Sequence, residues 1–487
     1  MSLAKAMADP KLFAPQFSGP SWAAWRTFIA ALFGLPMTAE QWEVYKTCTG
    51  RTEAPTMPFR EASLICGRRS GKSRLLSLIA VYLACFYDYS KFLVPGETGV
   101  LAVIAADRRQ ARVILRYCLG FLESIPLLKS KIVKADAEVI QLTNNIVLEI
   151  HTGRIAAPRG RTFIGVLCDE LAFWRDENSS HPDKDVVDAV RPGLITIPTS
   201  MLLMASSPYA KRGVLYNTYR RHFANNESKT LVWQAPTWTM NPGIARDGPT
   251  MTRAFDDDPA AAAAEYGAEF RSDIDSFVSR EVIDANTVFG RFELPPLHRY
   301  GESNAGIAIA YKAFVDPSGG SSDSMTLAVS HKEGDIAVLD AVREAHPPFS
   351  PEQTVAEFAA LLLTYGIHSV MGDRYGGEWP REQFRKHGIQ YEPADKPKSE
   401  IYKELLPLLN SRRVELLDIN RLNTQLAGLE RRTARGGRDS IDHAPGAHDD
   451  VINVVAGALV MVASKPDKLD VWRRLAMPGA IWTATHP

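Results

Sequence analysis

The sequence predicts an α/β protein made of two successive domains. Its length, 487 residues, exceeds what one ordinary hydrophobic core accommodates. Up to about residue 270, short apolar runs end in polar or glycine-containing turns, and helical stretches follow them. A segment rich in proline, glycine and charge at about 271–304 separates this pattern from a second alternation of strands and helices. We therefore expect domains at 1–270 and 305–464, a linker at 271–304 and a tail at 465–487.

In the first domain, four nearly continuous apolar runs have the composition of buried parallel strands. These runs are Ser63–Cys66, Gly99–Ile104, Phe163–Cys168 and Met201–Ala205. Residues 1–60, in which proline, tryptophan and phenylalanine are scattered, are expected to be irregular. The apolar run Leu75–Tyr87 is too short to cross a bilayer and is predicted to be a buried helix.

The second domain begins with three runs that predict an antiparallel meander: Ala305–Val315, Met325–Ser330 and Asp335–Val342. Further strands are expected at His368–Gly372 and Val414–Leu417. Helices are expected at Pro351–Tyr365, Pro380–His387, Ser399–Asn410, Arg421–Arg432 and 449–464.

The composition limits the classes of function. The formal net charge is zero, so any binding of nucleic acid must come from local basic patches. Candidate patches are Arg108, Arg109, Arg112 and Arg116, then Arg412 and Arg413, and last Arg431, Arg432, Arg435 and Arg438. The five cysteines show no metal-binding spacing, which indicates reduced thiols in a cytoplasm. The first residues lack the apolar core of a signal peptide, so we expect neither secretion nor a membrane partner.

A phosphate loop follows the first predicted strand. Gly71, Lys72 and Ser73 stand between this strand and a predicted helix, in the segment Gly67-Arg68-Arg69-Ser70-Gly71-Lys72-Ser73. In such a loop backbone N–H groups surround the phosphates, the lysine reaches the β/γ oxygens, and the hydroxyl holds Mg²⁺. Cys66 replaces the usual first glycine, and Gly67 is expected to take over its role. A chance turn is the alternative, which the flanking strand and helix disfavour.

The second half of a nucleotide site lies about a hundred residues later, where a buried strand ends in Asp169 and Glu170. We expect Asp169 to hold Mg²⁺ together with Ser73, and Glu170 to polarise the water that attacks ATP. The alternative is that both acids cap the helix that begins at Leu171.

Arginines complete this chemistry, because a guanidinium neutralises the charge that builds up in phosphoryl transfer. Arg68 and Arg69 lie inside the loop, and Arg159-Gly160-Arg161 precedes the strand that ends in the acids. Either group could act within its own subunit or on a neighbour. Each arginine has the alternative of a solvated or phosphate-contacting side chain.

The second domain carries acids where strands end and a helix starts. Asp316 closes its first strand, Asp373 closes its fourth, and Asp449-Asp450 opens the last helix. Converging carboxylates of this kind hold two Mg²⁺ or Mn²⁺ ions for phosphodiester cleavage. The order of three strands, a helix and a fourth strand indicates an RNase H-like fold. Alone, Asp316 or Asp373 has the alternative of a turn residue.

Adjacent helical residues point about 100° apart, so Asp449 and Asp450 cannot play the same role. We favour Asp450 as the metal ligand, with Asp449 or His448 as an auxiliary group. Asp323 is a further candidate ligand, and the role of His443 stays open.

In this order, the motifs resemble those of the large terminase subunit, the DNA-packaging motor of tailed bacteriophages. The resemblance covers nearly the whole chain. It rests on the loop Gly67–Ser73, the pair Arg159-Gly160 and the strand end Cys168-Asp169-Glu170. In addition, Ala205–Pro208 resembles the family's coupling motif, and Phe33–Pro36 through Gln41-Trp42 resembles its adenine-side segment.

The resemblance implies an N-terminal P-loop ATPase domain with a RecA/ASCE-like parallel sheet, followed by an RNase H-like nuclease domain. Gln41 would contact adenine, Arg159 would act in trans, and Arg68 or Arg69 in cis. The cofactors would be ATP with Mg²⁺, and two Mg²⁺ or Mn²⁺ ions at the nuclease site.

It also implies a function and a set of partners. The protein would pump double-stranded DNA into a procapsid and cut concatemeric DNA. Its partners would be the DNA, the portal protein, the small terminase subunit and further copies of itself in a ring, although isolated chains could be monomeric. It would act in the bacterial host cytoplasm, transiently on the portal.

Two other classes of protein remain as alternatives. A helicase-nuclease of DNA repair would need a second RecA-like domain, and residues 305–464 do not have that pattern. A nucleotide switch or scaffold with inactive sites is disfavoured because Lys72, Glu170 and the other acids are intact.

Overall fold

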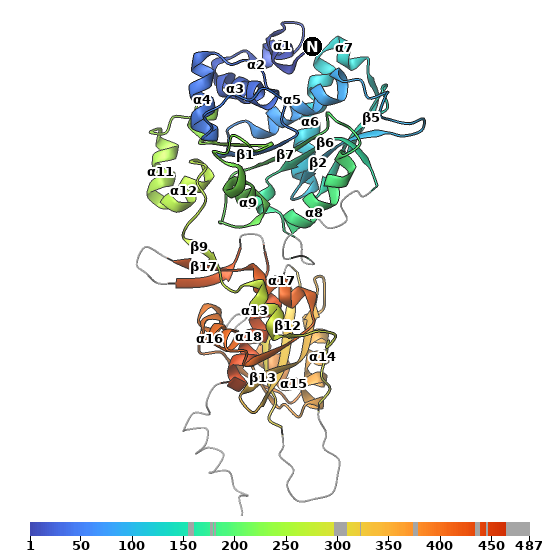
Figure 1. Ribbon diagram of the computed structural model, residues 1–487. Coiled ribbons are helices and arrows are strands. Elements are labelled where there is room, and N and C mark those ends of the chain that lie inside the picture. Colours follow the sequence, from blue (N-terminus) through green and yellow to red (C-terminus); the bar gives the residue numbers. More distant parts are fainter. Residues whose placement is uncertain are drawn as a thin grey trace, which may run out of the picture. The chain divides into compact units, whose positions relative to one another are not determined.

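A computed structural model describes residues 1–153, 160–175, 179, 182–296, 309–321, 323–373, 378–433, 439–444 and 447–463 (Figure 1). The chain divides into two compact units, Met1–Asp275 and Ser276–Pro487, and each unit is described by itself.

An eight-stranded sheet forms the centre of the first unit, in the order β3-β4-β5-β2-β6-β7-β1-β8. Its strands are β1 (Glu61–Cys66), β2 (Gly99–Ala105), β3 (Ile132–Ala135), β4 (Val139–Leu142), β5 (Ile146–Thr152), β6 (Thr162–Asp169), β7 (Met201–Ser206) and β8 (Thr230–Ala235). Only the β3-β4-β5 edge is antiparallel. The four predicted parallel strands are confirmed as β1, β2, β6 and β7. Strand β7 lies between β1 and β6, as in the predicted RecA/ASCE-like sheet.

Helices cover this sheet. They are α1 (Leu3–Ala8), α2 (Ala14–Phe17), α3 (Ala23–Leu32), α4 (Ala39–Thr49), α5 (Lys72–Phe86), α6 (Arg108–Ser124), α7 (Pro126–Lys129), α8 (Pro182–Val190), α9 (Gly213–His222), α10 (Thr237–Met240), α11 (Pro249–Asp257) and α12 (Pro259–Glu265), with the 3-10 turns η1 (Pro20–Trp22), η2 (Leu171–Phe173) and η3 (Arg191–Leu194). The predicted irregular segment 1–60 is therefore wrong. Aromatic side chains such as Trp25 and Phe28 drive its helices into the same core as α5.

The second unit contains a seven-stranded sheet in the order β10-β16-β13-β12-β11-β14-β15. Its strands are β10 (Thr287–Val288), β11 (Lys312–Asp316), β12 (Met325–Glu333), β13 (Ile336–Ala345), β14 (Ser369–Gly372), β15 (Gln390–Pro393) and β16 (Val414–Leu417). Strands β11, β12 and β13 form the predicted antiparallel meander, and β14 runs parallel to β11. This arrangement confirms the RNase H-like fold class.

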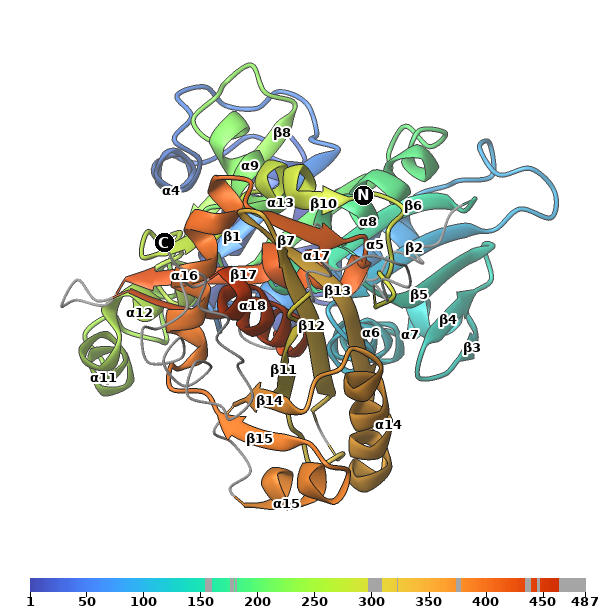
Figure 2. The same cartoon turned by 90° about the horizontal axis from the view of Figure 1, so that it is seen from below.

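Alternating side chains of β11 enter two cores. Ala313 and Val315 join the core beneath α14 (Pro351–Thr364), whereas Phe314 joins the core of α18 (Asp450–Ala463). Helix α18 crosses β11, β12 and β13 (Figure 2). Its close approach depends on Gly457, since an added Cβ would lie 2.4 Å from the Phe314 ring.

The other helices of this unit are α13 (Arg280–Asn286), α15 (Trp379–Lys386), α16 (Lys398–Asn410) and α17 (Asn420–Gly428). The helix predicted at Arg421–Arg432 is too long, because residues from Leu429 onward form β17 (Leu429–Thr433). Strand β17 pairs antiparallel with β18 (Asp439–His443), and Glu430 is fully buried in it.

Part of the expected linker has regular structure: β9 (Ile274–Ser276), α13 and β10. Phe277, Val278 and Ile283 belong to the core of α18. Residues 297–304 of the linker and the expected tail lie outside the described residues. Within the described part of the chain, no helix has both the length and the apolar character that a bilayer crossing requires.

Candidate nucleotide and metal sites

The phosphate loop joins β1 to α5, and Gly67 is its most tightly packed position. A Cβ added at Gly67 would lie 2.3 Å from Thr237 Oγ1 and 2.4 Å from the Tyr266 carbonyl oxygen, so a side chain cannot fit. The left-handed backbone occurs later in the loop, at Arg69 (φ 63°) and Gly71 (φ 101°). The glycine at position 67 thus provides space, and no positive φ is required where Cys66 replaces glycine.

Side chains far away in the sequence fix the loop by binding its carbonyl oxygens. Trp25 Nε1 donates to Ser70 at 2.8 Å, Thr237 Oγ1 donates to Arg68 at 2.8 Å, and Asn241 Nδ2 donates to Arg69 at 3.0 Å. The sequence did not indicate these three residues, because they follow no local motif. They leave the N–H groups of the loop free to face an anion.

The predicted magnesium ligands of this site meet at the start of α5. Ser73 Oγ donates to Asp169 Oδ2 at 3.3 Å. The other carboxylate oxygen of Asp169 is buried and has no hydrogen-bond partner among the described residues. Burial, followed by the charge of Glu170, raises the pKa of Asp169 to about 7. A buried carboxylate oxygen that lacks a partner, next to a hydroxyl, fits a Mg²⁺ ion.

Lys72 and Glu170 lie together beside this pair. Lys72 Nζ donates to the Cys66 carbonyl at 2.8 Å and lies 3.6 Å from Glu170 Oε1. The other oxygen of Glu170 accepts hydrogen bonds from Ser206 Oγ at 3.2 Å and from the Ser207 backbone at 3.3 Å. Glu170 has φ 51° and makes no side-chain cap on η2. The segment that resembles the coupling motif therefore holds the expected catalytic carboxylate.

Other predicted residues of the nucleotide site are placed as follows. Arg68 pairs with Glu265 at 3.0 Å. Gln41 lies in the first turn of α4, where its Oε1 accepts the Thr38 N–H at 3.0 Å in a capping box. Arg159 lies outside the described residues. The roles of Gln41, Arg159, Arg68 and Arg69 stay predictions.

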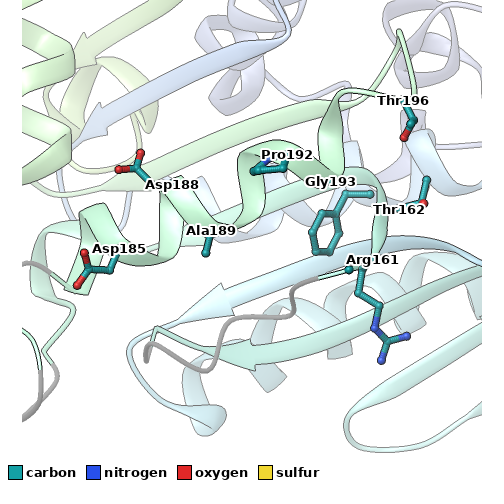
Figure 3. A pocket seen from close by; sticks show the side chains of 10 residues that line it. Arg161, Thr162, Asp185, Asp188, Ala189, Pro192, Gly193 and Thr196 are labelled. Atoms are coloured by element: carbon teal, nitrogen blue, oxygen red, sulfur yellow. The ribbon is translucent and has the colours of Figure 1, made fainter.

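A cavity of about 730 Å³ opens elsewhere in the first unit, between the start of β6 and the segment α8–η3 (Figure 3). Arg161 from β6 and Asp185 and Asp188 from α8 contribute its charged groups. Asp169 ends the same strand, about 23 Å away at the usual rise per residue. The cavity is therefore separate from the nucleotide site.

In the second unit, two predicted acids lie side by side. Val315 pairs with Gly372 across the parallel strands β11 and β14, so Asp316 and Asp373 follow at neighbouring strand ends. Burial raises the pKa of Asp316 to about 7; the Asn453 hydrogen bond opposes this shift, and the charge of Asp373 adds to it.

The start of α18 brings the third acid to this place. Thr326 Oγ1 on β12 donates to the Asp450 carbonyl at 2.8 Å, and Asn453, one turn later, donates to Asp316 Oδ2 at 2.8 Å. Gln425 accepts two N–H groups of the first turn at 2.9 and 3.0 Å. Asp450 Oδ2 is buried and has no hydrogen-bond partner within the described part of the chain. Such an oxygen fits a divalent cation.

Asp449, by contrast, is engaged by protein donors. Its Oδ2 accepts hydrogen bonds from Tyr402 at 2.9 Å and from Lys398 at 3.0 Å. Burial raises the pKa of Asp450, which His448 opposes and Asp449 and Asp323 reinforce. Asp323 thus acts on this site, and Asp450 is better placed than Asp449 as a ligand. Lys398 and Tyr402 were not foreseen from the sequence.

Several arginines of the expected DNA-binding patches have acidic partners. Arg112 pairs with Glu138 at 2.6 Å, Arg432 pairs with Glu430 at 3.1 Å, and Arg431 pairs with Asp439. Arg435 and Arg438 lie outside the described residues. These pairs reduce the positive charge that the patches present to DNA.

No protein-family model matches the chain, and no curated protein matches it. Among solved structures, the chain is similar to the HK97 bacteriophage large terminase, with a TM-score of 0.36, 14% identity, and coverage of 83% of this chain and 91% of that chain. For a large terminase from a thermophilic bacteriophage in complex with ADP, these values are 0.35, 10%, 85% and 97%. For the large terminase nuclease from thermophilic phage G20c with bound magnesium, they are 0.30, 20%, 38% and 96%. Large terminases, which the sequence motifs resemble, are thus also what the structure comparison finds.

Proposed function

We propose that the chain is a large terminase subunit, which uses ATP to move double-stranded DNA into a procapsid and cuts concatemeric DNA with a metal-dependent endonuclease. One observation carries the proposal: a single chain holds two separate sets of strand-end carboxylates, and only the first is joined by a phosphate-loop lysine and hydroxyl. An ATPase and a metal nuclease in one chain are the parts required to move DNA and then cut it.

At the first set, each residue has a distinct task in ATP hydrolysis. Lys72 contacts the β/γ phosphates, and Ser73 with Asp169 holds Mg²⁺. The bound ion would neutralise phosphate charge. Glu170 polarises the attacking water, and Arg159 in trans, with Arg68 or Arg69 in cis, stabilises the transition state. Gln41 contacts the adenine.

Glu170 also provides a path from hydrolysis to movement. Because Ser206 and Ser207 hold its carboxylate, a shift of the segment after β7 would move the group that positions water. Conversely, a change at the nucleotide would be felt by that segment. This reciprocal link supports the resemblance of Ala205–Pro208 to a coupling motif.

At the second set, Asp316, Asp373 and Asp450 hold two Mg²⁺ or Mn²⁺ ions, and Asn453 orients Asp316. The ions would activate water and stabilise the leaving oxygen of the DNA strand. The remaining partners of the proposal are the portal protein, the small terminase subunit and a ring of identical chains, in the bacterial cytoplasm.

The alternative, a helicase-nuclease, would contain a second RecA-like sheet. The second unit instead has the antiparallel meander β11-β12-β13 at its centre. A triplex-displacement assay separates the two functions. A double-strand translocase should displace a third strand from duplex DNA in an ATP-dependent manner without separating the duplex. ATP-dependent separation of the duplex strands would overturn the proposal in favour of a helicase.

A further inference from the structure

A second group of metal-binding side chains lies beside the proposed nuclease ligands. Asp442 and His443 on β18 and Asp449 before α18 place one ligand atom each within 4.8 Å of one another. The His443 ring directs Nε2 toward the acids, because Nδ1 lies 2.9 Å from the Ala444 carbonyl and donates to it. Two carboxylates and an imidazole form a ligand set that transition-metal ions accept.

A positive charge from the protein already lies among these groups. Lys398 Nζ, from the start of α16, is 2.8 Å from Asp442 Oδ1 and 3.0 Å from Asp449 Oδ2. Tyr402, one turn later, donates to the same Asp449 oxygen at 2.9 Å. One face of α16 thus fixes both β18 and the residue that precedes α18.

The exposed fractions show why this ion pair differs from an ordinary surface pair. The Asp449 side chain is 9% exposed, and the Lys398 side chain 34%. A buried carboxylate that loses its cation is strongly destabilised, whereas exposed pairs contribute little. The Asp449 carbonyl also accepts the Asn453 N–H at 2.8 Å, and Asn453 binds Asp316. Asp449 is therefore connected to the proposed metal ligands through the first turn of α18.

We propose that the Lys398 ammonium is a built-in cation, which occupies the Asp442–His443–Asp449 group in place of a divalent ion and positions the start of α18. The inference rests on the proposed nuclease function, which it deepens. Lys398 is a positioning residue: it blocks an unproductive third ion and directs divalent ions to the face formed by Asp316, Asp373 and Asp450.

Calorimetric titration of the full-length protein with Mn²⁺, without DNA, tests the blocking role. We expect Lys398→Met to bind one more Mn²⁺ per chain than the wild type, and the extra ion to disappear in Lys398→Met/His443→Ala. Lys403→Met is the matched control, since Lys403 lies on the same helix and pairs with Glu400 at 2.8 Å. Equal Mn²⁺ stoichiometry in Lys398→Met and the wild type would overturn the blocking role. Lys398→Gln serves the same test if Lys398→Met does not fold.

Plasmid cleavage tests the positioning role. We expect Lys398→Met to cut about 10–100-fold more slowly, as is usual when a partner of a metal ligand is removed. Lys398→Arg should retain most of the activity, and Lys403→Met all of it. Wild-type cleavage by Lys398→Met would overturn the positioning role. A wild type that cuts nothing would refute the nuclease proposal itself, while the Mn²⁺ stoichiometry would still decide the question of the built-in cation.

Discussion

The Glu170→Gln substitution tests the ATPase mechanism with a minimal structural change. The amide oxygen of glutamine can still accept the hydrogen bonds that Ser206 Oγ and the Ser207 N–H donate at 3.2 and 3.3 Å. The variant loses the negative charge that polarises water and lies 3.6 Å from Lys72. It should therefore fold and bind ATP, yet hydrolyse it slowly.

The size of the effect follows from the role of a positioned base. General base catalysis contributes about 10²–10⁴-fold, which corresponds to roughly 2.7–5.5 kcal/mol of activation free energy. Lys72, Ser73 and Asp169 remain in place, so the affinity for ATP should stay within about threefold of the wild type, which is less than 1 kcal/mol.

Steady-state ATP turnover measures the rate, and binding of a fluorescent ATP analogue measures affinity. Glu269→Gln is the control, since Glu269 is exposed and ends no strand of the sheet. ATP turnover by Glu170→Gln within about threefold of the wild type would refute the role given to Glu170, because a barrier change below 1 kcal/mol is too small for a lost base.

Three further predictions concern stability and the nuclease site. A methyl group at Gly67 would overlap two neighbouring atoms, so Gly67→Ala should lower the free energy of unfolding by about 1–3 kcal/mol. Denaturant unfolding measures this loss, and Gly120→Ala, whose Cβ would meet no atom within 4 Å, should show none. Asp450→Asn should abolish plasmid cleavage without changing ATP turnover; unimpaired cleavage would remove Asp450 from the ligands. Burial alone would lower the pKa of His331, but its hydrogen bond to Asp340 at 2.8 Å contributes to a raised pKa. The stability from this pair is therefore complete below about pH 6.5 and lost as the pH rises through the folded pKa. In thermal melts, the advantage of the wild type over His331→Gln should shrink with rising pH, and a constant difference would contradict the prediction.

The strands were predictable because parallel strands buried on both faces are continuous apolar runs. The helices of residues 1–60 were not predictable in the same way. Eight of the ten residues of α3 are buried, so it has no polar face to mark its helical period. Strand β17 was taken for helix because its conformation depends on pairing with β18, which no local pattern contains.

The candidate sites divide along the same line. Lys72, Ser73 and the acids at strand ends belong to local motifs, which the sequence displays directly. Trp25 and Lys398 act across 45 and 51 residues, on Ser70 and Asp449 respectively, so only the folded chain brings them to the sites. The choice between the adjacent acids Asp449 and Asp450 likewise required the donors on α16.

Digestion of plasmid DNA with Mg²⁺ or Mn²⁺, measured together with ATP turnover, tests the central claim that one chain carries an ATPase and a separate nuclease. The wild type should cut DNA with one of these ions. Asp373→Ala should lose cleavage and keep ATP turnover, whereas Lys72→Ala should lose ATP turnover and keep cleavage. Absence of cleavage by the wild type with both ions, or normal cleavage by Asp373→Ala, would contradict the account.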